Sequence, residues 1–352
     1  MKLRNLSTVA KECFKRYCIT ITKKNKKMIA NKETIKNIAL RLSVHSIHLK
    51  VFMANSKEIS IENLESEYKK QSEKNPKPFV KWVGGKRQLI QQFRERDLYP
   101  PEGFDLKTAT YFEPFVGGGA MFFDLLPKKA YLSDMNGELV TTYKVIKKDV
   151  NELIKKLKLH KKNDSKEYFL KVRALDVDKL TDVNVAARFI YLNRTCFNGM
   201  YRVNGSGKFN VPYAANENPL ICDEENLRKA HVAMKHTTIK WQDYAKVLEK
   251  AEKGDFIYFD PPYYPVSKTS SFTSYTKEGF LEKEQGKLRD VFVALSRKGC
   301  FVMLSNSDTP FINELYSNLG KKIRIEKVYA GRAINSKGSG RGKIKEVVVI
   351  NY

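Results

Sequence analysis

The segment Thr110–Asp134, TYFEPFVGGGAMFFDLLPKKAYLSD, decides the fold class. It opens with a short stretch, Thr110–Phe115, that contains aromatic residues typical of strands. The glycine run Gly117–Gly119 follows, Met121 begins a helical pattern, and Lys129–Asp134 is a second apolar strand that ends on an acid. Strand, glycine loop, helix and strand in this order form one βαβ unit, so we expect a parallel sheet.

Further strand patterns lie on the far side of a long helical region. Apolar residues recur at spacings of three and four from Val150 to about Arg194, which predicts helices. Residues 195–222 are rich in Asn, Gly and aromatic residues, which favours an irregular loop or hairpin. Strands are predicted at 237–241, 255–260, 300–304 and 344–351, with a helix near 282–297. We therefore predict an α/β catalytic domain that is interrupted by a smaller helical and loop-rich insert.

The glycine loop and the acid that ends the next strand indicate a nucleoside site. A dinucleotide fingerprint would need a glycine at position 122, which is Phe, so the loop admits a ligand to the backbone without indicating a pyrophosphate site. Asp134 stands where an acid can accept hydrogen bonds from ribose hydroxyls. A glycine-rich connector without a ligand is the alternative for the loop taken alone.

The segment Lys81–Lys86, KWVGGK, is similar to a phosphate-binding loop but lacks two of its residues. Val80 replaces the first glycine and Arg87 replaces the Ser or Thr after the lysine, which disfavours phosphoryl transfer. The indole of Trp82 and the ammonium of Lys86 could instead stack on and pair with a zwitterionic ligand. Trp82 as an ordinary core residue is the alternative.

Asp260 ends the predicted strand 255–260, and Pro261, Pro262 and Tyr263 follow it directly. Neither proline can donate a ladder hydrogen bond, so the strand must stop there. The Asp260 carboxylate and the Tyr263 ring are therefore held at the edge of a sheet on a stiff turn. Taken alone, the four residues could also be a strand terminator with surface aromatics.

The charge of the chain points to a polyanionic partner. The formal net charge is +26 over 352 residues, and such a field attracts nucleic acid. No apolar run reaches the roughly 18 residues that span a bilayer, so no membrane partner is expected. The five cysteines are odd in number and scattered, which favours a reducing, cytoplasmic compartment over a disulfide scaffold.

Residues 1–50 carry much of this charge, with 13 Lys and Arg against two acids. The alternatives for this segment are a solvated basic tail, a targeting arm and an extra DNA contact. Its Cys13, Cys18, His45 and His48 could be imagined as zinc ligands. The 26 residues between the two pairs fit common finger spacings poorly, so we predict no metal.

Five motifs occur in an order that identifies a family. They are FVKWVGGKRQ, FEPFVGGGA, YLSDMN, LNRTCFNGMYRVNGSGKFNVPY and FDPPYYPVSKTSSFTSY. From about Phe79 to the carboxyl terminus, the chain resembles the Dam-type DNA adenine-N6 methyltransferases, in which the ligand motif precedes a target-recognition insert and then DPPY. The resemblance implies a Rossmann-like S-adenosylmethionine-dependent methyltransferase sheet. It also implies a catalytic domain over residues 77–150 and 237–352, a target-recognition domain over 151–236, and a basic extension and linker over 1–76.

The resemblance also implies roles for individual residues. Asp260, Pro261, Pro262 and Tyr263 would form the methyl-transfer pocket. S-adenosylmethionine would be bound by Trp82, Lys86, Glu113, Phe115, Gly117, Gly119, Asp134 and Asp260, and by Asp243 in the stretch Trp241–Tyr244. Double-stranded DNA would be contacted by Lys81, Phe197, Asn198, Met200, Arg202 and Pro212, with Phe197 as a wedge where family members carry Tyr.

The implied reaction is methylation of N6 of a flipped adenine, at GATC by similarity. The basic loop 331–342 is expected to grip phosphates, with a solvated hairpin tip as the alternative. Other functions stay open: a catalytically silent DNA-binding homologue, or an amino methyltransferase acting on cytosine N4 or on a protein glutamine. The acid in DPPY favours adenine over cytosine, and the net charge of +26 disfavours a protein substrate.

Overall fold

A computed structural model describes residues 20–21, 28–29, 75–266, 280–320, 322–331 and 343–352. The chain divides into two compact units, one formed by residues 1–75 with 90–102 and the other by 76–89 with 103–352. In the first unit, β1 (Thr20–Ile21) pairs antiparallel with β2 (Met28–Ile29). The second unit holds the sheet and all the site residues discussed below.

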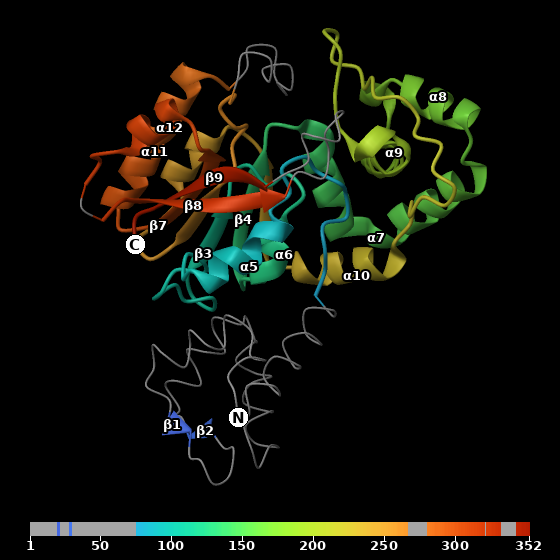
Figure 1. Ribbon diagram of the computed structural model, residues 1–352. Coiled ribbons are helices and arrows are strands. Elements are labelled where there is room, and N and C mark those ends of the chain that lie inside the picture. Colours follow the sequence, from blue (N-terminus) through green and yellow to red (C-terminus); the bar gives the residue numbers. More distant parts are fainter. Residues whose placement is uncertain (1–19, 22–27, 30–74, 267–279, 321, 332–342) are drawn as a thin grey trace. The chain divides into compact units, whose positions relative to one another are not determined.

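The sheet of the second unit has seven strands in the order β5-β4-β3-β6-β7-β9-β8 (Figure 1). Their bounds are β3 (Thr110–Glu113), β4 (Lys129–Asp134), β5 (Thr237–Trp241), β6 (Phe256–Phe259), β7 (Phe301–Ser307), β8 (Arg324–Gly331) and β9 (Lys343–Ile350). The first five in this order run parallel, whereas β9 is antiparallel to both β7 and β8. The predicted βαβ unit is confirmed, since β3 and β4 pair in parallel and α6 (Ala120–Leu125) joins them.

The central strands explain where the acids lie. All four residues of β6 are buried, as expected for a strand covered on both faces. Because β3, β4 and β6 are parallel, their carboxyl ends meet at one edge of the sheet. Glu113 ends β3, Asp134 ends β4 and Asp260 follows β6, so three acids lie along that edge.

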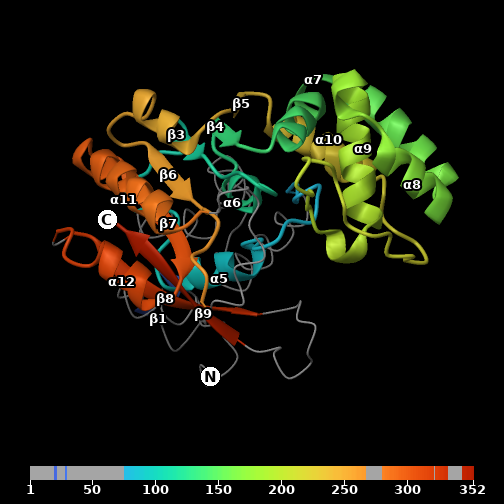
Figure 2. The same cartoon turned by 90° about the horizontal axis from the view of Figure 1, so that it is seen from above.

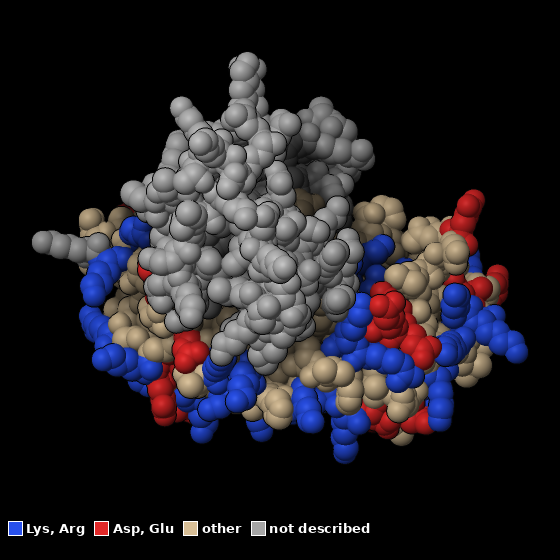
Figure 3. Space-filling model, turned by 90° about the horizontal axis from the view of Figure 1, so that it is seen from below, with Lys and Arg blue, Asp and Glu red and all other residues tan. Residues whose placement is uncertain are grey.

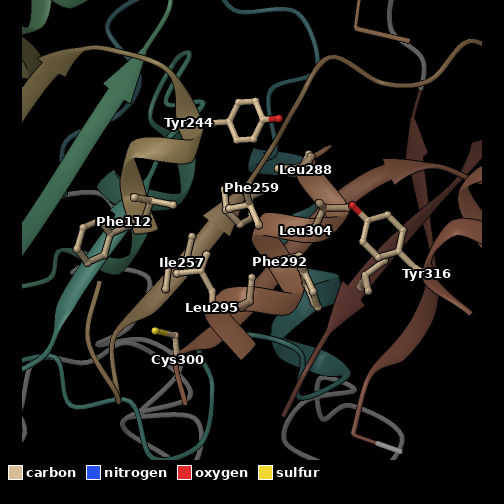
Figure 4. Close-up of a cluster of buried hydrophobic side chains, with 14 of the residues drawn as sticks. Phe112, Tyr244, Ile257, Phe259, Leu288, Phe292, Leu295, Cys300, Leu304 and Tyr316 are labelled. Carbon is tan, nitrogen blue, oxygen red and sulfur yellow. The ribbon is translucent and has the colours of Figure 1, made fainter. Parts of the chain in front are cut away.

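One face of the sheet is covered by α11 (Glu282–Arg297), α12 (Pro310–Tyr316) and the 3₁₀ helix η4 (Tyr244–Glu249). Figure 4 shows Leu288, Phe292 and Leu295 of α11 packed against Ile257 and Phe259 of β6. These side chains are fully buried and form one apolar cluster. The packing fixes α11 firmly against β6, immediately beside the turn that follows this strand.

The insert forms a helical lobe beside the sheet (Figure 2). Over the predicted residues 151–236 it holds the second half of α7 (Gly137–Asn163) and the whole of α8 (Lys166–Ala174), η2 (Val177–Lys179), α9 (Asp182–Thr195), η3 (Phe197–Gly199) and α10 (Glu224–Ala233). Asn136 caps α7, its Oδ1 accepting from the Leu139 N–H at 3.0 Å. Glu138 in the first turn of α7 pairs with buried Arg188 of α9 at 2.7 Å, which links the two helices. The helical geometry of α7 breaks at Asp149, beside the predicted boundary at residue 150.

Several elements were not predicted, namely α5 (Arg87–Glu95), α10, α12 and β8. No helix in the described part of the chain combines the length and apolarity that a membrane span requires. The loop 332–342 and Cys13, Cys18, His45 and His48 lie outside the described residues.

Candidate active site

The chain leaves β6 at Asp260 and enters a turn that side chains from two other elements hold. Gln285 Nε2 of α11 donates to the Pro262 carbonyl at 3.1 Å, and Asn306 Nδ2 of β7 donates to Gln285 Oε1 at 3.0 Å. Asn306 Oδ1 in turn accepts from the backbone N–H of Tyr264 at 3.1 Å. Gln285 and Asn306 are fully buried, and hydrogen bonds among buried, mutually satisfied groups rigidify a structure. The turn is therefore fixed by more than its two prolines.

The Asp260 carboxylate forms an ion pair with Lys86. The ammonium Nζ lies 2.8 Å from Asp260 Oδ1 and donates to the Gly84 carbonyl at 2.5 Å. The side chain of Lys86 is 4% exposed and that of Asp260 is 22% exposed, so the carboxylate keeps access to solvent. Burial raises the pKa of Asp260 to about 6, although Lys86 opposes this shift. At neutral pH Asp260 is therefore mostly ionised, and a carboxylate can accept further hydrogen bonds beside the one from Lys86.

The ring of Tyr263 lies beside this ion pair. Lys86 Nζ is 4.8 Å from the ring centroid, which is within cation–π range. The hydroxyl donates to Glu346 Oε2 of β9 at 2.7 Å. Burial raises the pKa of Tyr263 well above its ordinary value, and the neighbouring acids Asp260 and Glu346 raise it further. The hydroxyl thus stays protonated and acts as a hydrogen-bond donor.

The glycine loop is tied to the acid that ends β4. Asp134 Oδ2 accepts from the Gly117 N–H at 3.1 Å, and Oδ1 accepts from the Asn136 N–H at 2.9 Å. Burial raises the pKa of Asp134, whereas these backbone hydrogen bonds lower it. Gly117 has a φ of 46°, and a Cβ there would lie 2.6 Å from the Trp82 ring. Only glycine fits this position, so the loop backbone and the indole pack directly together.

Glu113, expected at the methyl donor, is 2% exposed and bridges two elements. Its Oε2 accepts from the Tyr111 hydroxyl at 2.9 Å and from the Phe122 N–H of α6 at 3.1 Å. Burial raises the pKa of Glu113 well above its ordinary value. These contacts attach the start of α6 to β3, and so they position the glycine loop between them.

Aromatic rings line the other side of the loop. Phe115 stacks on Tyr244 at a centroid distance of 5.2 Å and an interplanar angle of 26°, and the ring of Phe280 meets Phe115 edge-on at 5.8 Å. Exposed Asp243 caps η4, its Oδ1 accepting from the Ala245 N–H at 2.8 Å. The structure thus brings Phe115 next to η4, whose cap is Asp243.

The segment Lys81–Lys86 contacts three parts of the site. Lys86 binds Asp260, and Trp82 packs on Gly117 as described above. The Trp82 ring also stacks on Tyr201 of the insert, with centroids 6.1 Å apart and an interplanar angle of 22°. The Tyr201 hydroxyl donates to Glu138 Oε1 at 3.0 Å. One short segment therefore connects the insert, the glycine loop and the Asp260 turn.

Lys81, at the start of this segment, packs on the loop that follows α9. Asn193 Oδ1 accepts from the Lys81 N–H at 2.8 Å, and Asn193 Nδ2 donates to the carbonyls of Lys81 and Gly199 at 2.9 and 2.8 Å. A Cβ at Gly199, whose φ is 64°, would lie 2.4 Å from Lys81 Cδ. Phe197 is 51% exposed and Asn198 is exposed with a φ of 55°. Asn193 therefore holds Lys81 against Gly199, which follows exposed Phe197 and Asn198 in the chain.

The remaining insert residues lie in the same loop region. The Phe197 N–H donates to the Pro212 carbonyl at 2.9 Å, which places these two residues together. Exposed Arg202 is held by Asn210, since Arg202 Nε donates to Asn210 Oδ1 at 2.8 Å. Half-buried Met200 lies between Phe197 and Arg202 in the sequence. The six residues expected at DNA thus form one group, of which Phe197, Asn198, Arg202, Pro212 and Lys81 are exposed.

Sequence reasoning missed four residues that hold the site, namely Asn193, Gln285, Asn306 and Glu346. Each is a polar residue inside a helix or strand that otherwise looks ordinary. One signal was available for Asn306, because the polar run Ser305–Ser307 ends the apolar stretch of β7. The strand that ends at Asp134 and the strand that precedes Asp260 likewise pass from apolar residues to a polar one.

Comparisons with known proteins identify relatives of this chain. Residues 82–333 match the family described as D12 class N6 adenine-specific DNA methyltransferase. The Type II methyltransferase M1.LlaDCHI of Lactococcus lactis subsp. cremoris is 45% identical, over 79% of this chain and 96% of the relative. The Type II methyltransferase M.MjaIII of Methanocaldococcus jannaschii is 42% identical, over 78% of this chain and 99% of the relative.

A third relative carries the name of the family that the motifs resemble. The DNA adenine methylase of Escherichia coli K12 is 30% identical, over 79% of this chain and 96% of the relative. The matched region contains the glycine loop, the insert and the Asp260 turn, and the fold is that of a methyltransferase sheet. The chain therefore belongs to the D12 class of N6 adenine-specific DNA methyltransferases.

Proposed function

We propose that the protein transfers a methyl group from S-adenosylmethionine to N6 of an adenine flipped out of duplex DNA, within the sequence GATC. Membership of a methyltransferase family implies S-adenosylmethionine as the donor. The duplex, the base-flipping step and the recognised sequence are the parts of the proposal that go beyond family membership.

The residues at the glycine loop suit a nucleoside donor. Half-buried Phe115 offers a ring for stacking on the donor's adenine, and Asp134 offers carboxylate oxygens for ribose hydroxyls. Gly117 and Trp82 would contact the donor from the side of the loop opposite Phe115. Asp243, at the start of η4, would contact it as well. Glu113 and Gly119 would contribute by shaping the loop, since a Cβ at Gly119 would lie 2.5 Å from the Tyr143 hydroxyl.

Asp260 and the Pro261 carbonyl would activate the target nitrogen. The lone pair of an adenine amino group is delocalised into the ring, which makes the nitrogen a poor nucleophile. If the carboxylate and the carbonyl each accept one N–H, the nitrogen becomes more tetrahedral and its lone pair is freed. The bound donor supplies the methyl group as a substituent of its sulfonium. As the new N–C bond forms and the S–C bond breaks, Asp260 stabilises the positive charge on nitrogen and can accept the proton it releases.

The adenine must leave the duplex to reach this turn, as for other enzymes that act on bases. Tyr263 would receive the extruded base on its ring, and stacking of a base on an aromatic side chain is worth about 1–3 kcal/mol. Exposed Phe197 could fill the space in the stack. Both roles follow from position, since Tyr263 is adjacent to the Asp260 turn and Phe197 belongs to the loop beside Lys81.

The insert would read the bases around the adenine. Arg is the natural partner of guanine O6 and N7, and Arg202 is exposed with its guanidinium oriented by Asn210. Lys81 would contact an outer guanine, while Asn198, Met200 and Pro212 would meet other base edges. The proposed sequence GATC rests on the resemblance of this loop to the Dam-type motif.

The charge of the described surface supports a duplex as substrate. In Figure 3, Lys and Arg side chains are spread around the visible rim, while Asp and Glu form smaller groups. The net charge of +26 attracts a phosphate backbone whatever its sequence, and base contacts then select the site.

The observation that carries the proposal is the fixed acceptor turn, in which Lys86 pairs with Asp260 while Gln285 and Asn306 hold the backbone. Expression in methylation-deficient cells tests it. DNA from cells with the wild-type protein should resist an endonuclease blocked by adenine methylation at GATC, and it should be cut by one that requires this methylation. Asp260→Ala at matched protein level should give unmodified DNA. Unmodified DNA from cells that contain folded wild-type protein would refute the proposal.

A further inference from the structure

The Glu346 carboxylate accepts a hydrogen bond from the hydroxyl of Tyr263, the tyrosine that ends the DPPY motif. Glu346 itself lies outside all five sequence motifs. Glu346 Oε2 lies 2.7 Å from the Tyr263 hydroxyl oxygen, and Glu346 is half-buried. Glu346 belongs to β9, where it pairs with Ser307 of β7 and with Val328 of β8. A strand position between two neighbours moves little, so the backbone that carries the Glu346 carboxylate is held in place.

We propose that Glu346 is a positioning residue for methyl transfer, which holds the Tyr263 ring in the orientation that receives the extruded adenine. This inference rests on the proposed function. The backbone of the turn is fixed by Gln285 and Asn306, but those contacts leave the side-chain torsions of Tyr263 undetermined. The hydrogen bond to Glu346 fixes the far end of the ring, so that backbone and hydroxyl together define the plane on which the base stacks.

The orientation of the Tyr263 ring should affect kcat more than it affects the binding of substrates. A ring that rotates can still contact the adenine, but it holds the amino group away from Asp260 for part of the time. Misplacement of reacting groups by about 1 Å can lower a rate by about a hundredfold. Removing the Glu346 acceptor breaks one hydrogen bond and leaves the turn in place, so we expect a loss of about tenfold in kcat. The KM for the methyl donor should change little, because Glu346 does not belong to the glycine-loop site.

The experiment compares three single variants and one double variant in the full chain. Glu346→Gln keeps an acceptor for the tyrosine hydroxyl and removes the charge. Glu346→Leu removes the acceptor, and Tyr263→Phe removes the donor while it retains the ring. The double variant combines Glu346→Leu with Tyr263→Phe. The measurements are kcat, the KM for the donor and the KM for a GATC duplex.

Glu346→Gln should stay within about threefold of wild type in kcat, whereas Glu346→Leu and Tyr263→Phe should each lose about tenfold. The double variant should be no slower than either single variant, since both remove the same hydrogen bond. If Glu346→Gln falls as far as Glu346→Leu, or if the two losses multiply in the double variant, the inference is wrong. Unchanged kcat in Glu346→Leu would overturn it too.

A second measurement separates this inference from the proposed function. A fluorinated tyrosine placed at position 263 reports on its ring by ¹⁹F NMR without any catalysis. Its resonance should shift or broaden in Glu346→Leu and return toward the wild-type signal in Glu346→Gln. An unaltered resonance in Glu346→Leu would show that the ring is not held by this contact. Failure of the wild-type protein to methylate any duplex would instead contradict the proposed function alone.

Discussion

In the proposed reaction Asp260 must be ionised to stabilise the positive charge that develops on the amino nitrogen, yet it lies in a site that disfavours its own charge. Burial raises the pKa of Asp260 to about 6, and Lys86 keeps this pKa from rising further. Protonation would turn one carboxylate oxygen into a donor and would remove the negative charge that offsets the charge on the nitrogen. The pKa value therefore sets the lower pH limit for activity.

We predict that kcat/KM for the duplex falls as the pH is lowered through about 6, by up to about tenfold per pH unit below the midpoint, because kcat/KM reports the pKa of the free enzyme. The sign follows from the raised pKa, since the active carboxylate form is lost at a higher pH than for an ordinary aspartate. The measurement is kcat/KM for a GATC duplex between pH 5 and 8, with circular dichroism as a control for folding. A rate that stays constant down to pH 5 in folded protein would contradict this assignment.

Lys86→Met should move that pH limit upward. The variant removes the positive charge 2.8 Å from Asp260, and this charge is what lowers the pKa of the carboxyl. The midpoint of the pH–rate profile should therefore lie at a higher pH than in wild type. The conservative variant Lys86→Arg serves as the control, because it retains the charge. A midpoint in Lys86→Met at or below that of wild type would mean that Lys86 does not stabilise the ionised form.

At the scale of elements, α11 and β7 supply the side chains that hold the turn after β6. Gln285 and Asn306 are buried side chains bonded to each other, to the Pro262 carbonyl and to the Tyr264 N–H. Gln285→Leu leaves the half-buried Pro262 carbonyl and the buried Asn306 amide without their partners, which costs about 1–3 kcal/mol. We predict a free energy of unfolding lower by about this amount in urea titrations, and a loss of about tenfold or more in kcat.

Lys283→Leu on the same helix is the matched control, since Lys283 is exposed. It should leave both the unfolding free energy and kcat near wild type. If Gln285→Leu unfolds at a lower urea concentration but turns over normally, the network supports the fold without positioning the turn.

The segment Lys81–Lys86 links the insert to the proposed donor site through the stack of Trp82 on Tyr201. Such aromatic pairs contribute about 0.5–1.5 kcal/mol. We predict that Tyr201→Leu raises the dissociation constants for donor and duplex up to about tenfold, because both the indole and the base-reading loop lose support. Tyr201→Phe keeps the stack and should show a smaller effect in the same calorimetric measurements. Equal effects of the two substitutions would assign the role to the hydrogen bond with Glu138 instead.

At the scale of the whole molecule, the charge of +26 should dominate the affinity for DNA. Each phosphate contact contributes a slope of about −0.9 in a plot of log affinity against log salt concentration. With six or more contacts, affinity for a GATC duplex should fall by about a thousandfold between 50 and 200 mM salt. Fluorescence anisotropy of a labelled duplex provides the measurement. A slope near zero would exclude a phosphate-dominated interface.

Sequence alone predicted the elements with strong local patterns. The strand Lys129–Asp134 and the helix near 282–297 were predicted with the observed bounds, because apolar runs and helical spacing are local signals. The strand β8, RIEKVYAG, was missed because its many polar residues suit an edge strand exposed on one side. The contact between Tyr263 and Glu346 joins residues 83 positions apart, and no local pattern reveals such a pairing. The division of the catalytic domain at residue 150, and the role of residues 1–76, stay predictions.

The most direct test of the role of Asp260 is a single-turnover assay with labelled S-adenosylmethionine and a GATC duplex, comparing wild type with Asp260→Ala. We predict that, with both ligands at saturating concentrations, methyl transfer to adenine by the variant is slower by about a hundredfold to a thousandfold. Transfer by Asp260→Ala at a rate close to that of wild type would contradict the claim that this carboxylate activates the amino nitrogen.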